Sequence, residues 1–130
     1  PNDGVDFTID RDEFVSLWGA RINAYLAGSA LDGYGEIFAN AAFEYGVDPR
    51  VSPAISNTES TKGANCFRSH NAWGWMGTAH WSDWETAIDA HVSGFASGYG
   101  YTVTLSTAKK YCPPTYEDWY GKTISQIALI

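Results

Sequence analysis

The chain has 130 residues, a length typical of one compact domain, and 45% of them are hydrophobic, which is enough to build a single core. Eight Lys and Arg stand against 15 Asp and Glu, and the resulting net charge of -7 argues against nucleic acid or an anionic membrane surface as a partner. No apolar run is long enough to cross a bilayer, so no membrane partner is expected.

The first part of the chain predicts an extended lead-in over residues 1–9 and then two helices. Asp10 and Glu13 have the spacing of a capping box, and apolar residues then recur at helical spacing over about residues 11–27. A second helix is expected over 35–45, with Gly46 in the left-handed position beyond its end. The apolar face expected on the first helix consists of Phe14, Leu17, Trp18, Ile22 and Tyr25.

A third helix is expected from Pro49 to the neighbourhood of Glu59. Asp48 is a suitable cap for this helix, and Pro49 suits its first turn because the missing N–H would have no partner there. Pro53 lies further inside than is comfortable, since it removes an early hydrogen bond and favours a bend.

The second half of the chain predicts a long loop and three more helices. From residue 61 to 81 no period of 2 or 3.6 is sustained, which is typical of an irregular loop or a small hairpin. Ser82 and Glu85 have capping-box spacing and predict a helix over about 83–97. Shorter helices are expected over 104–111 and, with Thr115 as cap, over 116–128. The predicted architecture is mainly α, as a single domain over residues 1–130.

Glu59 is the strongest candidate for chemistry, because it ends an apolar helix and precedes a loop rich in aromatic side chains. A carboxyl at a helix C-terminus faces the negative end of the helix dipole, and neighbouring rings exclude water from it. Both effects favour the protonated form, which a general acid needs. The plainer interpretation is a solvated glutamate at a helix end.

Aromatic residues make up 15% of the chain, with six Trp and eight Tyr, which exceeds what a core of this size demands. We therefore expect some rings to line a groove and stack on sugar faces. Trp18 and Trp119 fall on apolar helical faces and are assigned to the core, whereas Trp81 and Trp84 suit either place. His91 lies on an apolar helical stripe and is interpreted as a core histidine.

Two cysteines, Cys66 and Cys112, fit either one disulfide in an exported protein or two free thiols. We expect the bridge, which would close a loop of 46 residues (112 - 66). These cysteines, His70 and His80 lack the spacing typical of zinc ligands, so no metal and no other cofactor is expected.

Three segments follow one another in a suggestive order: residues 54–60 with Glu59, an Asn-x-x-Gly loop at 71–74, and a tyrosine segment at 108–114 before an aromatic-led stretch at 119–124. Together they resemble the glucosaminidase domains of the lysozyme-like superfamily, bacterial enzymes that cleave the N-acetylglucosamine-containing glycan of peptidoglycan. The resemblance extends over about residues 35–128. It implies an α+β lysozyme-like fold and a monomeric enzyme that is secreted or associated with the cell wall.

The resemblance also implies a role for each matched residue. Glu59 would protonate the leaving oxygen of a β-1,4 bond next to N-acetylglucosamine or N-acetylmuramic acid, in peptidoglycan or a chitin-like oligosaccharide. Tyr111 would lie across the cleft and hold the acetamido group or stabilise positive charge on the sugar. The Cys66 to Cys112 bridge would join the two sides of the cleft. Further substrate contacts are expected from Ser60, His70, Asn71, Trp73, Gly74 and Trp75, although His70 is more simply a surface residue of the loop.

A second catalytic carboxylate is not identified by the sequence. After Tyr111 the chain reads Cys-Pro-Pro where the family continues Ala-Thr-Asp, so one carboxylate of the family is absent. Asp83 and Glu85 lie nearest to the tryptophan-rich loop, but they more simply cap the next helix. Hydrolysis and the formation of an anhydro sugar both stay open. The alternative function is a glycan-binding or adhesion module that has lost its chemistry, and an unrelated helical interaction domain would leave the tryptophans unexplained.

Overall fold

The computed structural model describes residues 3–130, and each regular element within them is a helix. The predicted mainly α class is confirmed, whereas the β part of the expected class is not observed, because none of these residues forms a strand. The first two residues of the predicted lead-in lie outside the described residues. In chain order the helices are α1 (Arg11–Leu26), α2 (Gly35–Tyr45), α3 (Val51–Ser60), α4 (Trp84–Gly98), α5 (Leu105–Tyr111), the 3-10 helix η1 (Pro113–Thr115) and α6 (Tyr116–Ile127).

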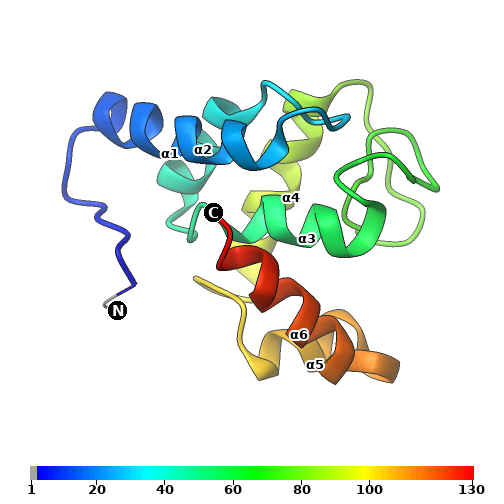
Figure 1. The fold of residues 1–130 in the computed structure, drawn as a ribbon. Coiled ribbons are helices and arrows are strands. Elements are labelled where there is room, and N and C mark those ends of the chain that lie inside the picture. Colours follow the sequence, from blue (N-terminus) through cyan, green and yellow to red (C-terminus); the bar gives the residue numbers. More distant parts are fainter. Residues whose placement is uncertain (1–2) are drawn as a thin grey trace.

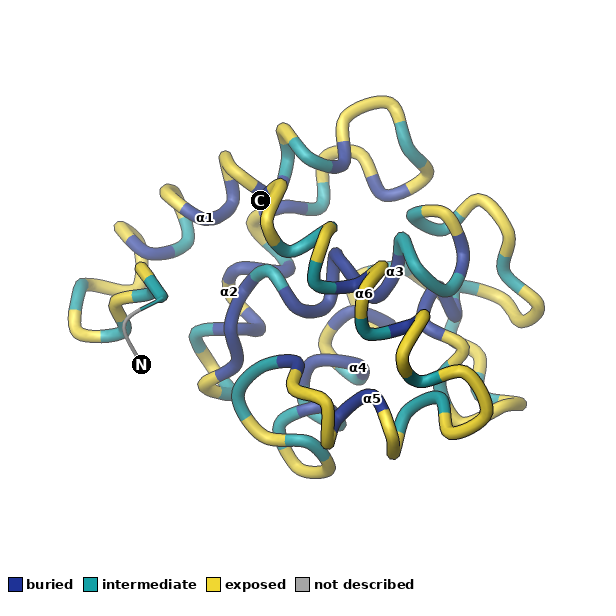
Figure 2. Tube along the Cα trace, turned by 60° about the horizontal axis from the view of Figure 1, so that its bottom comes forward, coloured by how far each residue is buried: buried dark blue, intermediate teal, exposed yellow. Residues whose placement is uncertain are grey.

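Helix α3 lies in the middle of the molecule, between the α1 and α2 pair and the α5 and α6 pair (Figure 1). Residues 51–56 of this helix are all buried, as the tube in Figure 2 shows, while residues 57–59 are half-buried. Residues 61–83 form an irregular loop beside the C-terminal end of α3 (Figure 1). The last turn of α3 therefore emerges from the core next to this loop, and that turn carries Glu59.

Helices α1 and α2 pack closely along one buried face, and their predicted bounds differ from the observed ones by at most one residue. Asp10 caps α1 by accepting a hydrogen bond from the Asp12 N–H. Leu17, which was predicted on the buried face, is 50% exposed, so that prediction is wrong. The close approach depends on Gly19, because a Cβ there would lie 2.6 Å from Cγ of Glu36. The side chains of α1 that are buried are Phe14, Trp18, Ile22 and Leu26.

Helix α3 begins at Val51, two residues later than predicted, and the prediction of Asp48 as its cap is wrong. The Asp48 carboxylate lies just before the helix, where it accepts from the N–H of Arg50 at 3.1 Å, from Nε and Nη2 of Arg50, both at 2.9 Å, and from the hydroxyl of Thr102 at 3.0 Å. Pro53 is consequently the third residue of the helix, where its missing N–H would have no partner within the helix. The concern that this proline bends the helix is thereby removed.

Helix α4 begins at Trp84, and its cap is Asp83, whose carboxylate accepts from the Thr86 N–H at 2.7 Å. The prediction of Ser82 as the capping residue is therefore wrong by one position. Helix α5 starts with Thr104 and Thr107 in a reciprocal capping box. Helix α6 lies against α3, and the hydroxyls of Thr58 and Thr123 form a hydrogen bond of 2.8 Å between the two. This contact brings α6 beside the last turn of α3.

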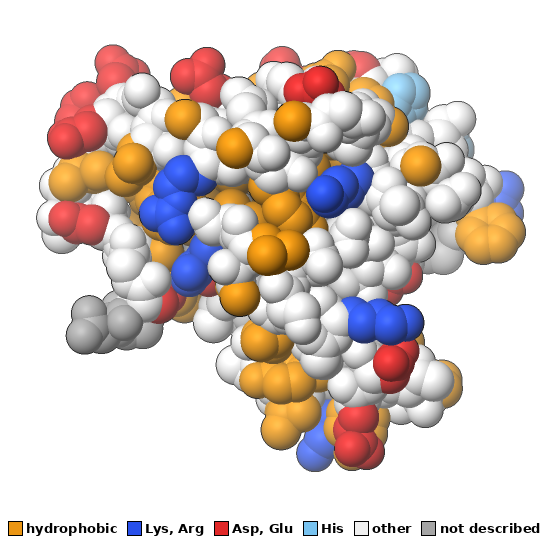
Figure 3. Space-filling view, in the orientation of Figure 1, with side chains coloured by type: hydrophobic (Ala, Val, Ile, Leu, Met, Phe, Trp, Pro, Cys, Tyr) orange, Lys and Arg blue, Asp and Glu red, His pale blue; other side chains and the backbone are white. Residues whose placement is uncertain are grey.

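On the face shown in Figure 3, many of the acidic side chains lie along the upper edge, while basic side chains are scattered over the rest of this face. No continuous basic stripe is visible on this face, which agrees with the net charge of -7. Within residues 3–130, no helix combines the length and the apolar character that a membrane crossing requires.

Candidate functional site

Glu59 lies one residue before the end of α3, as predicted, and its carboxyl group is half-buried. Nε1 of Trp119, from α6, donates a hydrogen bond of 2.7 Å to Oε2 of Glu59. Burial raises the pKa of the Glu59 carboxyl, and the hydrogen bond from Trp119 offsets part of this rise because it favours the charged form. The two oxygens of Glu59 thus differ, since no group in the described chain donates a hydrogen bond to Oε1.

A pocket of about 530 Å³ opens beside this carboxyl, and we call it the Glu59 pocket. Apart from Glu59 itself, it is formed by the end of α3 and by the loop that follows. Glu59 is the only carboxylate among the described residues that line it. Its lining consists of Glu59, Ser60, Asn65, Phe67, Arg68, Asn71, Gly74 and Gly77. The sequence predicted four of these, Glu59, Ser60, Asn71 and Gly74, and missed the other four.

Gly74 brings the loop backbone against the free side of the Glu59 carboxyl. Its φ is +60°, in the left-handed region that glycine adopts at low cost. A Cβ at this position would lie 2.9 Å from Oε1 of Glu59, which is too close for a side chain. The predicted contact of Gly74 with the site is therefore a close backbone approach, and any larger residue would displace the carboxyl.

Asn71 organises the loop, and its side chain has no capacity left for a substrate. Its Nδ2 donates to the carbonyls of Trp75 at 2.8 Å and Ala79 at 2.9 Å, and its Oδ1 accepts from the N–H groups of Trp73 and Trp75. These four bonds use both donors and both lone pairs of the amide. The prediction that Asn71 offers hydrogen bonds to a sugar does not fit this arrangement, although the residue does line the pocket.

Trp73 and Trp75, two of the three tryptophans of the loop, lie in or against the core and do not line the pocket. Trp73 is completely buried, its Nε1 donates to the carbonyl of Ser52 at 3.0 Å, and its ring stacks on His91 with 4.9 Å between centroids. Trp75 is half-buried and packs against His91, Tyr99 and Tyr111. Trp73 therefore exposes no face to a sugar, and the predicted stacking by this residue is wrong.

Tyr111 is linked to Glu59 through Trp119 and does not line the pocket. Its ring stacks on Trp119 with 4.9 Å between centroids, and Trp119 in turn holds Glu59. The Tyr111 hydroxyl donates to the carbonyl of Trp73 at 2.7 Å and lies 3.2 Å from Nε2 of His91. Burial raises the pKa of Tyr111 well above its usual value, and the Glu59 carboxylate adds to this rise. A direct contact of this hydroxyl with substrate does not fit its position.

His91 completes a closed chain of hydrogen bonds behind the site. Because the Tyr111 hydroxyl donates to a carbonyl, it accepts from Nε2–H of His91, which leaves Nδ1 to accept from the hydroxyl of Ser52 at 2.8 Å. Trp73 closes the ring by donating to the backbone of Ser52. The interpretation of His91 as a core histidine is confirmed, since its exposure is 0% and both ring nitrogens have partners.

The side chains of Ser60 and His70 form hydrogen bonds with the backbone of the loop. The Ser60 hydroxyl is buried, donates to the carbonyl of Ala72 at 2.6 Å and accepts from the N–H of Gly63. Nδ1 of His70 lies 2.9 Å from the carbonyl of Trp81, and its ring meets Trp84 edge-on. His70 is not among the residues that line the Glu59 pocket, so the structure does not support its predicted contact with substrate.

Cys66 and Cys112 are free in this structure, so the predicted bridge is absent from it. Sγ of Cys66 lies 3.4 Å from the carbonyl of Gly63, and Sγ of Cys112 lies 3.3 Å from the hydroxyl of Thr115. Each thiol is thus paired within its own local turn. No cluster of three or more side chains suited to a metal ion occurs in residues 3–130.

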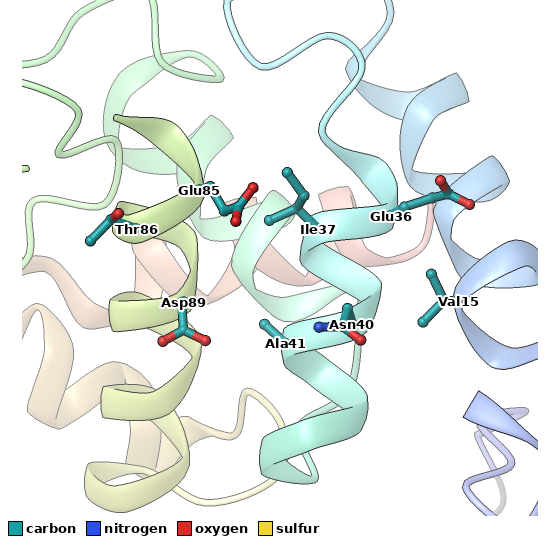
Figure 4. A pocket seen from close by; sticks show the side chains of 8 residues that line it. All are labelled: Val15, Glu36, Ile37, Asn40, Ala41, Glu85, Thr86 and Asp89. Atoms are coloured by element: carbon teal, nitrogen blue, oxygen red, sulfur yellow. The ribbon is translucent and has the colours of Figure 1, made fainter. Parts of the chain in front are cut away.

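The two carboxylates considered as partners of Glu59 lie elsewhere. Asp83 is occupied as the cap of α4, and Glu85 lines a separate hollow of about 550 Å³. Figure 4 shows this hollow between α2 and α4, with Glu85 and Ile37 pointing toward each other from the two helices. Its lining includes the apolar side chains of Val15, Ile37 and Ala41, and its acidic side chains, Glu36, Glu85 and Asp89, are exposed. It shares no residue with the Glu59 pocket.

Comparisons of the chain with protein-family models, with curated proteins and with solved structures each found no match. The function proposed below therefore rests on the geometry of the Glu59 pocket and on the sequence motifs.

Proposed function

We propose that the chain is a secreted, lysozyme-like glycosidase that cleaves a β-1,4 bond in peptidoglycan or a related N-acetylglucosamine-containing glycan. The observation that carries this proposal is the environment of Glu59. Its Oε2 is held by Trp119, its Oε1 has no partner in the described chain, and the carboxyl lies in a pocket of about 530 Å³. Burial raises the pKa of this carboxyl, so a larger fraction is protonated near neutral pH.

In the proposed reaction, protonated Glu59 donates its proton from Oε1 to the glycosidic oxygen, and the bond from this oxygen to the sugar C1 breaks. The carboxylate that remains is stabilised by the N–H of Trp119, which already points at Oε2. This hydrogen bond strengthens as the negative charge develops, so it assists proton donation rather than substrate binding.

The pocket supports a mechanism with one protein carboxylate. Glycosidases usually place a second carboxylate within about 5–10 Å of the acid, as nucleophile or base. Glu59 is the only carboxylate among the described residues that line the pocket. We therefore propose that a group of the substrate itself, its acetamido oxygen or a sugar hydroxyl, attacks C1. Attack by the acetamido oxygen gives a cyclic oxazolinium, which water then opens to a reducing sugar, whereas attack by the hydroxyl closes an anhydro ring. In either case the proton released by the water or the hydroxyl returns to the Glu59 carboxylate.

The test is release of soluble sugar from purified bacterial cell walls by the wild type and by Glu59→Gln, which keeps the shape of the side chain but cannot donate the acid proton. We expect Glu59→Gln to lose activity by a factor of about 10² or more, the size typical of a general acid. Glu85→Gln is the matched control, because it neutralises an exposed glutamate of the separate hollow and is expected to keep full activity.

Three results would overturn parts of this proposal. Full activity of Glu59→Gln removes the assigned acid, and loss of activity in Glu85→Gln relocates the site to the α2 and α4 hollow. Binding of cell walls without cleavage by either protein favours a glycan-binding or adhesion module. Mass spectrometry of the released ends then separates a reducing sugar from an anhydro sugar, which differ by one water.

A further inference from the structure

Arg68 is the one arginine of this chain whose guanidinium has no partner among the described residues. Arg11 pairs with Glu44, Arg21 donates to the carbonyl of Ile130 and lies over the Trp18 ring, and Arg50 holds Asp48. Arg68 is exposed, lines the Glu59 pocket and makes no such contact in residues 3–130. Its five N–H donors are thus available to a molecule in the pocket.

The charge of the pocket makes this arginine informative. The chain carries a net charge of -7, and Arg68 is the only cationic residue among the described residues that line the pocket. A guanidinium binds a carboxylate through two parallel hydrogen bonds, a geometry that a neutral sugar hydroxyl does not match. The arrangement therefore favours a ligand that carries a carboxylate over one that carries none.

Phe67 precedes Arg68 and lines the same pocket. Its side chain is fully exposed, with a relative accessibility of 102%, while most phenylalanine rings of the chain lie in or against the core. An exposed ring beside a pocket offers an apolar face on which a pyranose can stack. Phe67 and Arg68 together match a ligand with a sugar face and a carboxylate close to each other.

We propose that the Glu59 pocket selects a glycan that bears carboxylates over a neutral one, with Arg68 binding the carboxylate and Phe67 stacking on the sugar. This inference deepens the proposed function and rests on it for the identity of the polymer. Peptidoglycan supplies such carboxylates from two sources, the lactyl group of muramic acid once its peptide has been removed, and the peptide stem when it is attached. Chitin supplies none.

The experiment measures binding by calorimetry in the Glu59→Gln background, so that the ligands stay intact. The probes are a muramic-acid-containing glycan without peptide, the same glycan with its stems, and a chitin oligosaccharide of equal length. We expect Arg68→Gln to weaken binding of at least one carboxylate-bearing probe by about tenfold, the size expected for one charge-assisted pair. Its effect on chitin should stay below about twofold. The probe that responds identifies the lactyl group or the stem as the source.

Two further variants separate charge from recognition. Lys122→Gln removes one positive charge from exposed α6, outside the Glu59 pocket, and should leave all three affinities unchanged. Phe67→Ala should weaken all three probes to a similar extent, because stacking does not depend on charge. Arg68→Lys should restore only part of the binding that Arg68→Gln loses, since an ammonium lacks the paired donors.

Equal affinity of the Glu59→Gln protein for chitin and for both acidic probes would overturn the inference, and so would an equal loss for all probes when Arg68→Gln is added. Failure of the proposed function leaves a different pattern. If the wild type cleaves no cell wall but Arg68 still determines the preference for carboxylates, the pocket is an acidic-glycan receptor without chemistry.

Discussion

At the scale of single residues, the site depends on the contacts of the Glu59 carboxyl group with the core on one side and with the loop on the other. The core side supplies Trp119, whose N–H binds Oε2 of Glu59, and the loop side supplies Gly74, whose backbone lies against Oε1. Burial and the hydrogen bond act in opposite directions on the pKa of Glu59, and burial is the larger effect. The Glu59 carboxyl therefore holds its proton to higher pH than an ordinary glutamate, while it is still partly open to solvent.

Trp119→Phe tests this balance. The substitution keeps an aromatic ring stacked near Tyr111 but removes the donor that stabilises the Glu59 carboxylate. The pKa of Glu59 should then rise further, so the fall in kcat/KM on the alkaline side should move to higher pH. The pH profile of kcat/KM on cell walls measures this shift.

Trp81→Phe is a suitable control for the loss of an indole, because Trp81 is half-buried and makes no hydrogen bond to Glu59. Its profile should coincide with that of the wild type. An alkaline limb that stays in place or moves to lower pH in Trp119→Phe would show that this hydrogen bond does not tune Glu59.

At the scale of helices, the loop of residues 61–83 is fixed to α4 by the fit between Trp75 and Gly94. A Cβ on Gly94 would lie 2.6 Å from Cζ2 of Trp75, and this ring is already surrounded by His91, Tyr99 and Tyr111. The ring therefore has little room to move away. The small residue on α4 sets the distance of the loop from the helix.

Gly94→Ala and Gly98→Ala form a matched pair on α4 that tests this fit. Both substitutions gain helix propensity, worth up to about 1 kcal/mol. Gly98 has room for a Cβ, whose nearest neighbour outside the helix would be Nζ of Lys110 at 3.8 Å, so Gly98→Ala should raise the free energy of unfolding. Gly94→Ala should lower it by about 1–3 kcal/mol through overpacking. Urea denaturation measures both, and an equal gain in the two variants would contradict the proposed fit.

The bounds of helices were predicted correctly where the signals are local. The predictions were wrong where contacts with distant residues determine the bounds. The bounds of α2 and the left-handed Gly46 follow from residues within one turn. The start of α3 was predicted two residues early, because residues 49–50 form a turn before the helix; Asp48 accepts from the Arg50 N–H at this turn, and its carboxylate also binds the Arg50 guanidinium and Thr102 from the segment before α5. That last contact spans more than fifty positions and leaves no trace in the local pattern.

At the scale of the whole molecule, the sequence predicted that Glu59 lies at the end of α3 beside the loop, but not which group holds its carboxyl. Glu59 could be found because helix end, apolar run and aromatic loop adjoin it in the chain. Trp119 was assigned to the core alone, since its contact with Glu59 spans 60 positions. Trp73 was placed in the cleft by the family resemblance, and neither the motif nor the excess of aromatic residues shows which rings the fold covers. Phe67 and Arg68 belong to none of the motifs found in the sequence, so they were not predicted to line the pocket.

The hydrogen-bonded ring behind the site links the stability of the whole molecule to pH through His91. Burial lowers the pKa of His91 to about 3, against 6.5 for an ordinary histidine. The unfolded chain therefore takes up a proton that the native protein does not. The stability that neutral His91 contributes is complete above pH 6.5 and is lost as pH falls toward about 3. In this window we expect the free energy of unfolding to fall by about 1.4 kcal/mol per pH unit from this group.

Other titrating groups also change the free energy of unfolding in the same experiment, some in the same direction as His91 and one in the opposite direction. The pKa of Glu59 is raised, so its protonation favours the native state as pH falls and opposes the effect of His91. Measurement in the Glu59→Gln background removes that contribution. The lowered pKa values of Asp3, Asp6 and Asp83 add a further loss of stability mainly below about pH 4, the range in which unfolded aspartates titrate. Urea denaturation between pH 6.5 and 4.5 therefore isolates His91.

The His91→Gln variant should be less stable at pH 7, and its free energy of unfolding should change much less with pH over this range. An unchanged slope would assign the pH dependence to other groups.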